Sequence, residues 1–198
     1  MTAQRAKASA VKRYSTLNKT DCLMKKILFI CTHNRCRSLL AEAITNHLGN
    51  GMLEARSAGS QPAGEVHPLS LQYLQQAGIE TGSLMSQFWN DHEQWQPDIV
   101  ITVCDDAAGE ACPVWFGNSI RVHWGLSDPS RAAGDAEAIA AAFRHTIATL
   151  NVRVTQLLHS HSELLDDSSR ESLHLQNPAH GNRDTLATVL QKLATLYP

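Results

Sequence analysis

Short apolar runs alternate with amphipathic segments along most of this chain. Four runs have the length and β-branched character of strands, at residues 26–30, 52–57, 98–104 and 120–124. Apolar residues recur at helical spacing in three further segments, from residue 39, over 67–77 and from 135 to 157. The polar and aromatic stretch 86–95 is also predicted to be helical, with Pro97 ending it.

This order of elements predicts an α/β fold. The run from Asp98 to Cys104 is almost continuously apolar, which is typical of a strand covered on both faces. Strands that alternate with helices form a parallel sheet with right-handed crossovers, so helices are expected on both faces of the sheet.

Length and charge narrow the class of protein. A chain of 198 residues with 43% hydrophobic residues can bury one core, and its net charge of −2 provides no general basic field. Nucleic acid is therefore not an expected partner. No apolar run approaches about 18 residues, so no spanning helix and no membrane partner are expected.

The ends of the chain differ in composition from its middle. Residues 1–24 carry five Lys or Arg against one acid, which indicates a disordered extension or, as an alternative, a transit peptide. Residues 25–159 form the predicted domain. Residues 160–184, rich in Ser, His, Asp and Asn, are predicted to be a linker, and an apolar stripe beginning at Leu186 predicts a helix that completes the C-terminal segment 160–198.

The most informative stretch is Cys31-Thr32-His33-Asn34-Arg35-Cys36-Arg37-Ser38, between the first predicted strand and helix. Such a turn points consecutive backbone N–H groups at one place and suits a tetrahedral oxyanion. The same field is expected to lower the pKa of Cys31 and make it a thiolate nucleophile. Arg37 can hold two anion oxygens, and Ser38 can donate a hydrogen bond to the sulfur.

The five cysteines allow other interpretations. Cys31 could be an inert buried thiol, and clustered cysteines can also bind zinc. The chain contains no Cys-x2-Cys or His-x3-His pair, so we predict no metal site. Five is an odd number of cysteines, and three of them, Cys31, Cys36 and Cys104, follow or interrupt the predicted strands. This pattern is unlike a secreted disulfide framework and favours a reducing cytoplasm.

The motif Cys-x5-Arg-Ser, in Ile-Leu-Phe-Ile-Cys-Thr-His-Asn-Arg-Cys-Arg-Ser, resembles the low-molecular-weight tyrosine phosphatase fold and in particular its thiol-dependent arsenate reductase branch. The resemblance covers about residues 25 to 158. It implies the flavodoxin-like strand order 2-1-3-4. It also implies that the oxyanion lies against residues of the loop, namely Thr32, His33, Asn34, Arg35, Cys36 and Arg37, although His33 and Arg35 replace the small residues expected there.

Asp128 follows the fourth predicted strand and precedes Pro129. It could merely form an Asp-Pro turn. Its loop is, however, expected to share a sheet edge with the Cys31 loop, and the family places an Asp-Pro there, so we predict that Asp128 is the general acid.

Two further cysteines, Cys104 and Cys112, separate a reductase from a phosphatase, which needs one cysteine. They could be packed free thiols. The resemblance implies instead that Cys31 attacks arsenate, Cys104 attacks the Cys31 sulfur as arsenite leaves, and Cys112 then forms a disulfide with Cys104. The seven-residue spacer is one longer than in the best-known members.

The predicted function is thus reduction of arsenate to arsenite, with phosphate or sulfate as competing anions. No bound cofactor is expected, and the external reductant is thioredoxin or glutathione with glutaredoxin. The alternative is a phosphatase that hydrolyses phosphotyrosine through Cys31. Ser130 argues against it, because the phosphatases usually carry Tyr after Asp-Pro. A non-catalytic anion-binding or redox-sensing module is a third possibility.

Overall fold

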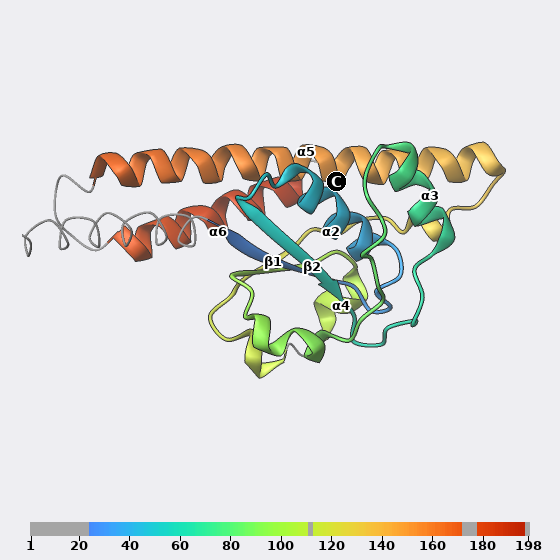
Figure 1. Cartoon of the computed structure of the whole chain (residues 1–198), viewed down its shortest axis with the longest axis horizontal. Helices are drawn as coiled ribbons and strands as arrows, with labels where there is room; N and C mark the ends of the chain where they lie inside the picture. The colour runs from blue at the N-terminus through green and yellow to red at the C-terminus, as the bar shows by residue number, and fades with distance from the viewer. Residues whose placement is uncertain (1–23, 111–112, 172–177, 197–198) are drawn as a thin grey trace, which may run out of the picture.

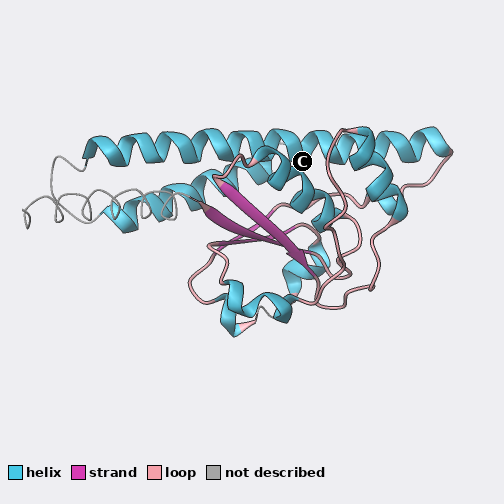
Figure 2. Cartoon of the chain, in the orientation of Figure 1, coloured by secondary structure: helices cyan, strands magenta, loops and turns pink. Residues whose placement is uncertain are grey.

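The computed structural model describes residues 24–110, 113–171 and 178–196. Its centre is a parallel sheet of four strands in the order β2-β1-β3-β4 (Figure 2). The strands are β1 Lys25–Ile30, β2 Leu53–Ala58, β3 Ile99–Thr102 and β4 Ile120–His123. The predicted fold class and strand order are confirmed.

The central strand β1 fixes the register of the sheet. Ile27 lies opposite Ala55 of β2 and Ile99 of β3, and all three side chains are buried. Because the strands are parallel, their carboxyl ends meet at one edge of the sheet. The loops that follow β1, β3 and β4 are therefore brought together there.

Helices flank this sheet. The α-helices are α2 Arg37–Leu48, α3 Pro68–Gln76, α4 Asp105–Gly109, α5 Ala136–Glu171 and α6 Pro178–Leu196, and the 3-10 helices are η1 Trp89–Trp95, η2 Val114–Phe116 and η3 Pro129–Arg131. The long helix α5 runs along one side of the molecule, with α2 between it and the sheet (Figure 1). The short helices η1 and η2 lie beyond the opposite side.

Two predicted segments differ from the structure. Only 89–95 of the stretch 86–95 is helical, as the 3-10 helix η1, because Phe88 forms a β-bridge with Gly59 and Gln87 N–H donates to Asn34. The linker predicted over 160–184 is wrong in two places, because α5 continues to Glu171 and α6 begins at Pro178. The polar residues after residue 160 do not end α5, because α6 packs against this helix and stabilises it.

Helix α6 packs against α5 and β4. Leu186, Leu190 and Leu193 are buried on its inner face. The Trp124 indole donates a hydrogen bond to the Leu190 carbonyl (3.0 Å). The predicted C-terminal helix is thus an integral part of the domain core.

The fully buried Arg153 of α5 joins the same two regions. Its guanidinium donates to the carbonyls of Trp124 (3.1 Å) and Ala194 (3.4 Å). Burial lowers the pKa of this guanidinium. Arg153 therefore connects α6 to the chain that leaves β4.

The predicted disordered extension, apart from Met24, lies outside the described residues. No helix in the described ranges has the length and apolar character needed to cross a bilayer.

Candidate active site

The loop of residues 31–36 joins the carboxyl end of β1 to the start of α2. It borders a pocket of about 270 Å³. Cys31 and five predicted anion-loop residues line the pocket, namely Thr32, His33, Arg35, Cys36 and Arg37. The rest of the lining comes from segments further along the chain: Ala63, His67, Asp106, Asp128, Ser130 and Arg131. One predicted anion-loop residue, Asn34, is fully buried and does not line it.

The Cys31 sulfur is buried beneath this pocket, with 5% of the residue exposed. It lies 3.0 Å from the Ser38 hydroxyl, as the sequence analysis anticipated. Burial nevertheless raises the pKa of the Cys31 thiol, although Ser38 and backbone N–H groups act in the opposite direction. The expected lowering of the Cys31 pKa is therefore wrong in direction, because desolvation outweighs the hydrogen bonds.

Asn34 organises the loop from behind. It has a left-handed backbone (φ 41°), which Asn tolerates better than most residues. Its amide donates to the hydroxyls of Ser38 (2.9 Å) and Ser57 (2.8 Å), while its carbonyl accepts from Gln87 N–H (2.6 Å). Since Asn34 uses the Ser38 oxygen as acceptor, the Ser38 proton is available for the Cys31 sulfur.

The same network ends in a buried carboxyl group. Ser57 donates to Glu42 of α2 across 2.6 Å. Burial raises the pKa of Glu42 to about 7, and the Ser57 hydrogen bond opposes this rise only in part. An ionisable group is thus coupled to the anion loop through Ser57 and Asn34.

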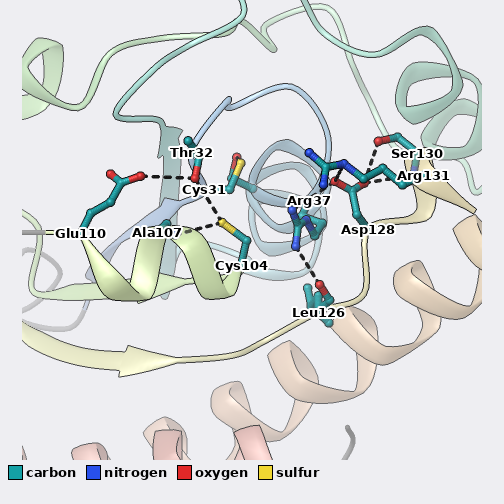
Figure 3. A network of polar contacts seen from close by, with 11 residues as sticks. Cys31, Thr32, Arg37, Cys104, Ala107, Glu110, Leu126, Asp128, Ser130 and Arg131 are labelled. Carbon is teal, nitrogen blue, oxygen red and sulfur yellow. Dashed lines mark hydrogen bonds and ion pairs between the residues drawn. The ribbon is translucent and has the colours of Figure 1, made fainter.

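Arg37 and Asp128 both line the pocket, and Figure 3 shows them close together. The guanidinium donates to Leu126 O (2.9 Å) and to the Asp128 carboxylate (3.1 Å). The other Asp128 oxygen accepts from the hydroxyl (2.7 Å) and backbone N–H (3.0 Å) of Ser130. The two predicted catalytic residues are thus hydrogen-bonded to each other.

Cys104 lies beside the anion loop at the start of α4. Its sulfur accepts from Ala107 N–H (3.4 Å) and is 3.7 Å from the Thr32 hydroxyl (Figure 3). It is buried, and its charge would oppose ionisation of Cys31, which places the two sulfurs in each other's electrostatic range. Cys104 thus lies next to the anion loop, in contact with the residue that follows Cys31, whereas Cys112 lies outside the described residues.

Cys36 is a third buried thiol in this region. Burial raises its pKa to about 12. Such a thiol stays protonated at neutral pH, which suits a packing role.

Among the described residues, no group of three or more His, Cys, Asp or Glu side chains is arranged to hold a metal ion. The pocket that the loop borders is lined by the two arginines of the loop, Arg35 and Arg37.

A profile of the low molecular weight phosphotyrosine protein phosphatase family matches residues 26–166. This chain belongs to that family. The match begins in β1 and ends within α5, so it includes the anion loop, Cys104 and Asp128 but not α6.

Individual relatives are arsenate reductases. The chain is 33% identical over 130 residues to the arsenate reductase of Halalkalibacterium halodurans, covering 66% of this chain and 92% of the relative. The Bacillus subtilis arsenate reductase is 34% identical over 113 residues, covering 57% and 80%.

Two solved structures that resemble this chain are also arsenate reductases. An arsenate reductase in the phosphate-binding state superposes with a TM-score of 0.59 at 28% identity, covering 69% of this chain and 98% of that one. A thioredoxin-dependent arsenate reductase from Corynebacterium glutamicum gives 0.56 at 28% identity, covering 80% and 70%.

Several residues that position the anion loop were not predicted from the sequence. Ser57 and Gln87 hold Asn34, and Glu110 accepts a hydrogen bond from Thr32 (3.3 Å). Gly59 lies so near the loop that a Cβ would come within 2.5 Å of Thr32 O. The position of Ser57 and Gly59 at the end of β2, next to β1 in a parallel sheet, is the signal that could have identified them.

Proposed function

We propose that this chain is an arsenate reductase in which Cys31 is the nucleophile and Cys104 is the second thiol of a cysteine cascade. The observation that carries the proposal is that Cys104, a second buried cysteine, lies beside the loop of Cys31. The Cys104 sulfur is within hydrogen-bonding distance of the hydroxyl of Thr32, the residue that follows Cys31. A phosphatase requires one nucleophilic thiol, whereas reduction by thiols needs two sulfurs to supply two electrons. The arsenate reductase relatives support the same activity.

Anion binding is the first step. The loop N–H groups and Arg37 bind arsenate, whose oxygens replace the Asp128 carboxylate as acceptor for Arg37. A bound dianion can take the proton of the Cys31 thiol, while the Ser38 hydroxyl donates to the resulting thiolate. This route does not need Cys31 to be ionised beforehand, in keeping with the raised pKa of the buried thiol.

Arsenate is then reduced in two chemical steps. The Cys31 sulfur forms a bond to arsenic, and an arsenic–oxygen bond breaks as that oxygen leaves as water. Asp128, released from Arg37, takes up the proton that the anion received from Cys31 and passes it to the leaving oxygen, so that Asp128 ends the step as a carboxylate again. The Cys104 thiolate next attacks the Cys31 sulfur. The sulfur–arsenic electron pair stays with arsenic, which is reduced from the +5 to the +3 state, and a Cys31–Cys104 disulfide forms.

Regeneration needs a thiol reductant from outside the chain. We propose that Cys112 attacks Cys104 and that thioredoxin reduces the resulting Cys104–Cys112 disulfide, by analogy with the thioredoxin-dependent relative. Glutathione with glutaredoxin is the alternative reductant. Phosphate and sulfate, which share the tetrahedral shape of arsenate, should compete for the loop.

Paired assays test this function. Arsenate-dependent oxidation of thioredoxin and hydrolysis of an aryl phosphate are measured on the same preparation, with Cys31→Ser as the inactive control. We expect arsenate reduction that requires Cys31 and Cys104 and at most slow ester hydrolysis. Rapid ester hydrolysis without arsenate reduction would identify a phosphatase and overturn the proposal.

A further inference from the structure

The imidazole of His123, the last residue of β4, lies between the two segments that flank Cys104. Its Nδ1 is 2.9 Å from the Thr102 hydroxyl, and its Nε2 is 3.0 Å from the Asp105 carboxylate. Thr102 ends β3 and is the register partner of His123 in the sheet, whereas Asp105 is the first residue of α4. The ring therefore connects the strand that precedes Cys104 to the helix that follows it.

Hydrogen-bonding chemistry assigns a role to each ring nitrogen. A carboxylate can only accept, so Nε2 carries a proton and donates it to Asp105. In the neutral ring Nδ1 is then an acceptor, and the Thr102 hydroxyl lies closer to it (2.9 Å) than to its other acceptor, Val122 O (3.5 Å). Both nitrogens of His123 are thus occupied, and the ring is held at each end.

The N-terminal side of Cys104 is fixed by backbone hydrogen bonds. The Leu126 N–H donates to the carbonyl of Val103, the residue before Cys104, across 3.2 Å. The Leu126 carbonyl in turn accepts from Arg37 (Figure 3). The chain that enters Cys104 therefore has a defined position relative to the guanidinium of the anion loop.

The C-terminal side of Cys104 has fewer attachments. Helix α4, Asp105–Gly109, has only five residues. Within the described ranges, the bond from Asp105 to His123 is the only side-chain hydrogen bond between a residue of α4 and a strand. Gly125 packs over this bond, since a Cβ there would lie 2.9 Å from Nε2 of His123. His123 is thus the side chain that attaches the first turn of α4 to the sheet.

We propose that His123 is a positioning residue for the second thiol of the reaction. By holding Asp105, it keeps the first turn of α4, with Cys104 at its N-cap, beside the anion loop. The inference rests on the proposed function, which assigns to Cys104 the attack on Cys31. Such a step is fast only when the reacting atoms are held close and aligned. Loss of the bond should therefore slow the attack and leave oxyanion binding unchanged.

Two substitutions each keep one half of the His123 contact. The amide nitrogen of Gln replaces Nε2 as a donor to Asp105, whereas the amide oxygen of Asn replaces Nδ1 as an acceptor from Thr102. If His123 positions α4, His123→Gln should behave like the parent and His123→Asn should not. If His123 serves only the stability of the sheet, His123→Asn should be the better replacement, because it keeps the bond between β4 and β3.

The first readout is formation of the Cys31–Cys104 disulfide in a single turnover at saturating arsenate. It is measured by rapid quench and mass spectrometry in the Cys112→Ser background. We expect His123→Asn to slow this step about two- to fivefold and His123→Gln to stay near the parent rate, since the Asp105 side chain is 94% exposed and such contacts are weak. Phosphate affinity, measured by isothermal titration, should be the same in all three proteins. Equal rates for the two variants, or a phosphate affinity that falls with the rate, would overturn the proposal.

A second readout needs no arsenate. The amides of Ala107 and Ala108 bond to the sulfur (3.4 Å) and carbonyl (3.2 Å) of Cys104, so their hydrogen exchange reports on the first turn of α4. In the full reduced protein, exchange should be about two- to fivefold faster in His123→Asn and unchanged in His123→Gln. Asp105→Ala should have the same effect as His123→Asn and add nothing when combined with it.

The two readouts separate failure of the proposal from failure of the proposed function. No arsenite from the Cys112→Ser parent would refute the proposed function and leave the exchange result standing. Unchanged exchange in His123→Asn would refute the attachment of α4 by His123. Faster exchange with an unchanged rate of disulfide formation would show that the attachment exists but does not position Cys104, which also overturns the proposal.

Discussion

Replacing Asp128 with Asn should affect binding and chemistry in opposite directions. The Arg37 and Asp128 side chains are 16% and 19% exposed and bond across 3.1 Å, so an incoming anion must displace a partly buried, charge-assisted hydrogen bond. Such bonds contribute about 1.5–3 kcal/mol. Asn keeps an oxygen acceptor for Arg37, so we take the lower end of this range. We expect phosphate to bind about tenfold more tightly, equivalent to about 1.4 kcal/mol.

The same substitution removes the proposed proton donor. Formation of arsenite in a single turnover should slow by about 10²- to 10⁴-fold. Phosphate affinity is measured by isothermal titration, and arsenite by rapid quench. Asp106→Asn is the matched control, because Asp106 lines the pocket without bonding to Arg37. Weaker phosphate binding in Asp128→Asn would refute the competition for Arg37, and an unchanged rate would exclude Asp128 as the acid.

Three other expectations can be checked separately. Cys112→Ser should release one equivalent of arsenite and stall as a Cys31–Cys104 disulfide seen by mass spectrometry, whereas turnover at the parent rate with glutathione and glutaredoxin would exclude Cys112 as the resolving thiol. Glu42 has a pKa raised by burial from 4.5 to about 7, so the stability it contributes is fully present below pH 4.5 and is lost as the pH rises to about 7. Relative to Glu42→Gln, the parent's free energy of unfolding should therefore fall over this window by up to about 1.4 kcal/mol per pH unit, and parallel curves would contradict the assignment. Arg153→Met leaves the buried Trp124 carbonyl and the partly buried Ala194 carbonyl without their guanidinium donor and should lower the free energy of unfolding by about 2–4 kcal/mol, whereas Arg144→Met, at an exposed position, should change it little.

The sheet and its anion loop could be predicted because their signals are local. The apolar run before Cys31 and the helical spacing after Ser38 define a strand-to-helix turn without knowledge of the rest of the chain. The meeting of Asp128 and Arg37 follows from the parallel sheet, whose strand ends share one edge.

The unpredicted features depend on contacts between distant segments. Asn34 is bonded to Ser57 and Gln87, which are 23 and 53 residues away and carry no motif of their own. The pKa of Cys31 was mispredicted because the depth of its burial depends on the packed loops above it, not on the loop sequence. Helix α5 was predicted to be too short because its packing partner α6 begins only at Pro178, beyond the polar stretch in which the prediction ended the helix.

The hydrogen bond between Trp124 and the Leu190 carbonyl also has a consequence for synthesis of the protein. Its two ends are 66 residues apart in the chain. At about 5–20 residues per second, the ribosome needs roughly 3–13 s to synthesise the residues between Trp124 and Leu190. During that time the nascent chain already contains the complete sheet and the catalytic loops, while the indole N–H and the apolar surface that Leu186, Leu190 and Leu193 will cover remain open. The chain is therefore most prone to aggregate in the interval before α6 has been synthesised and has covered this apolar surface.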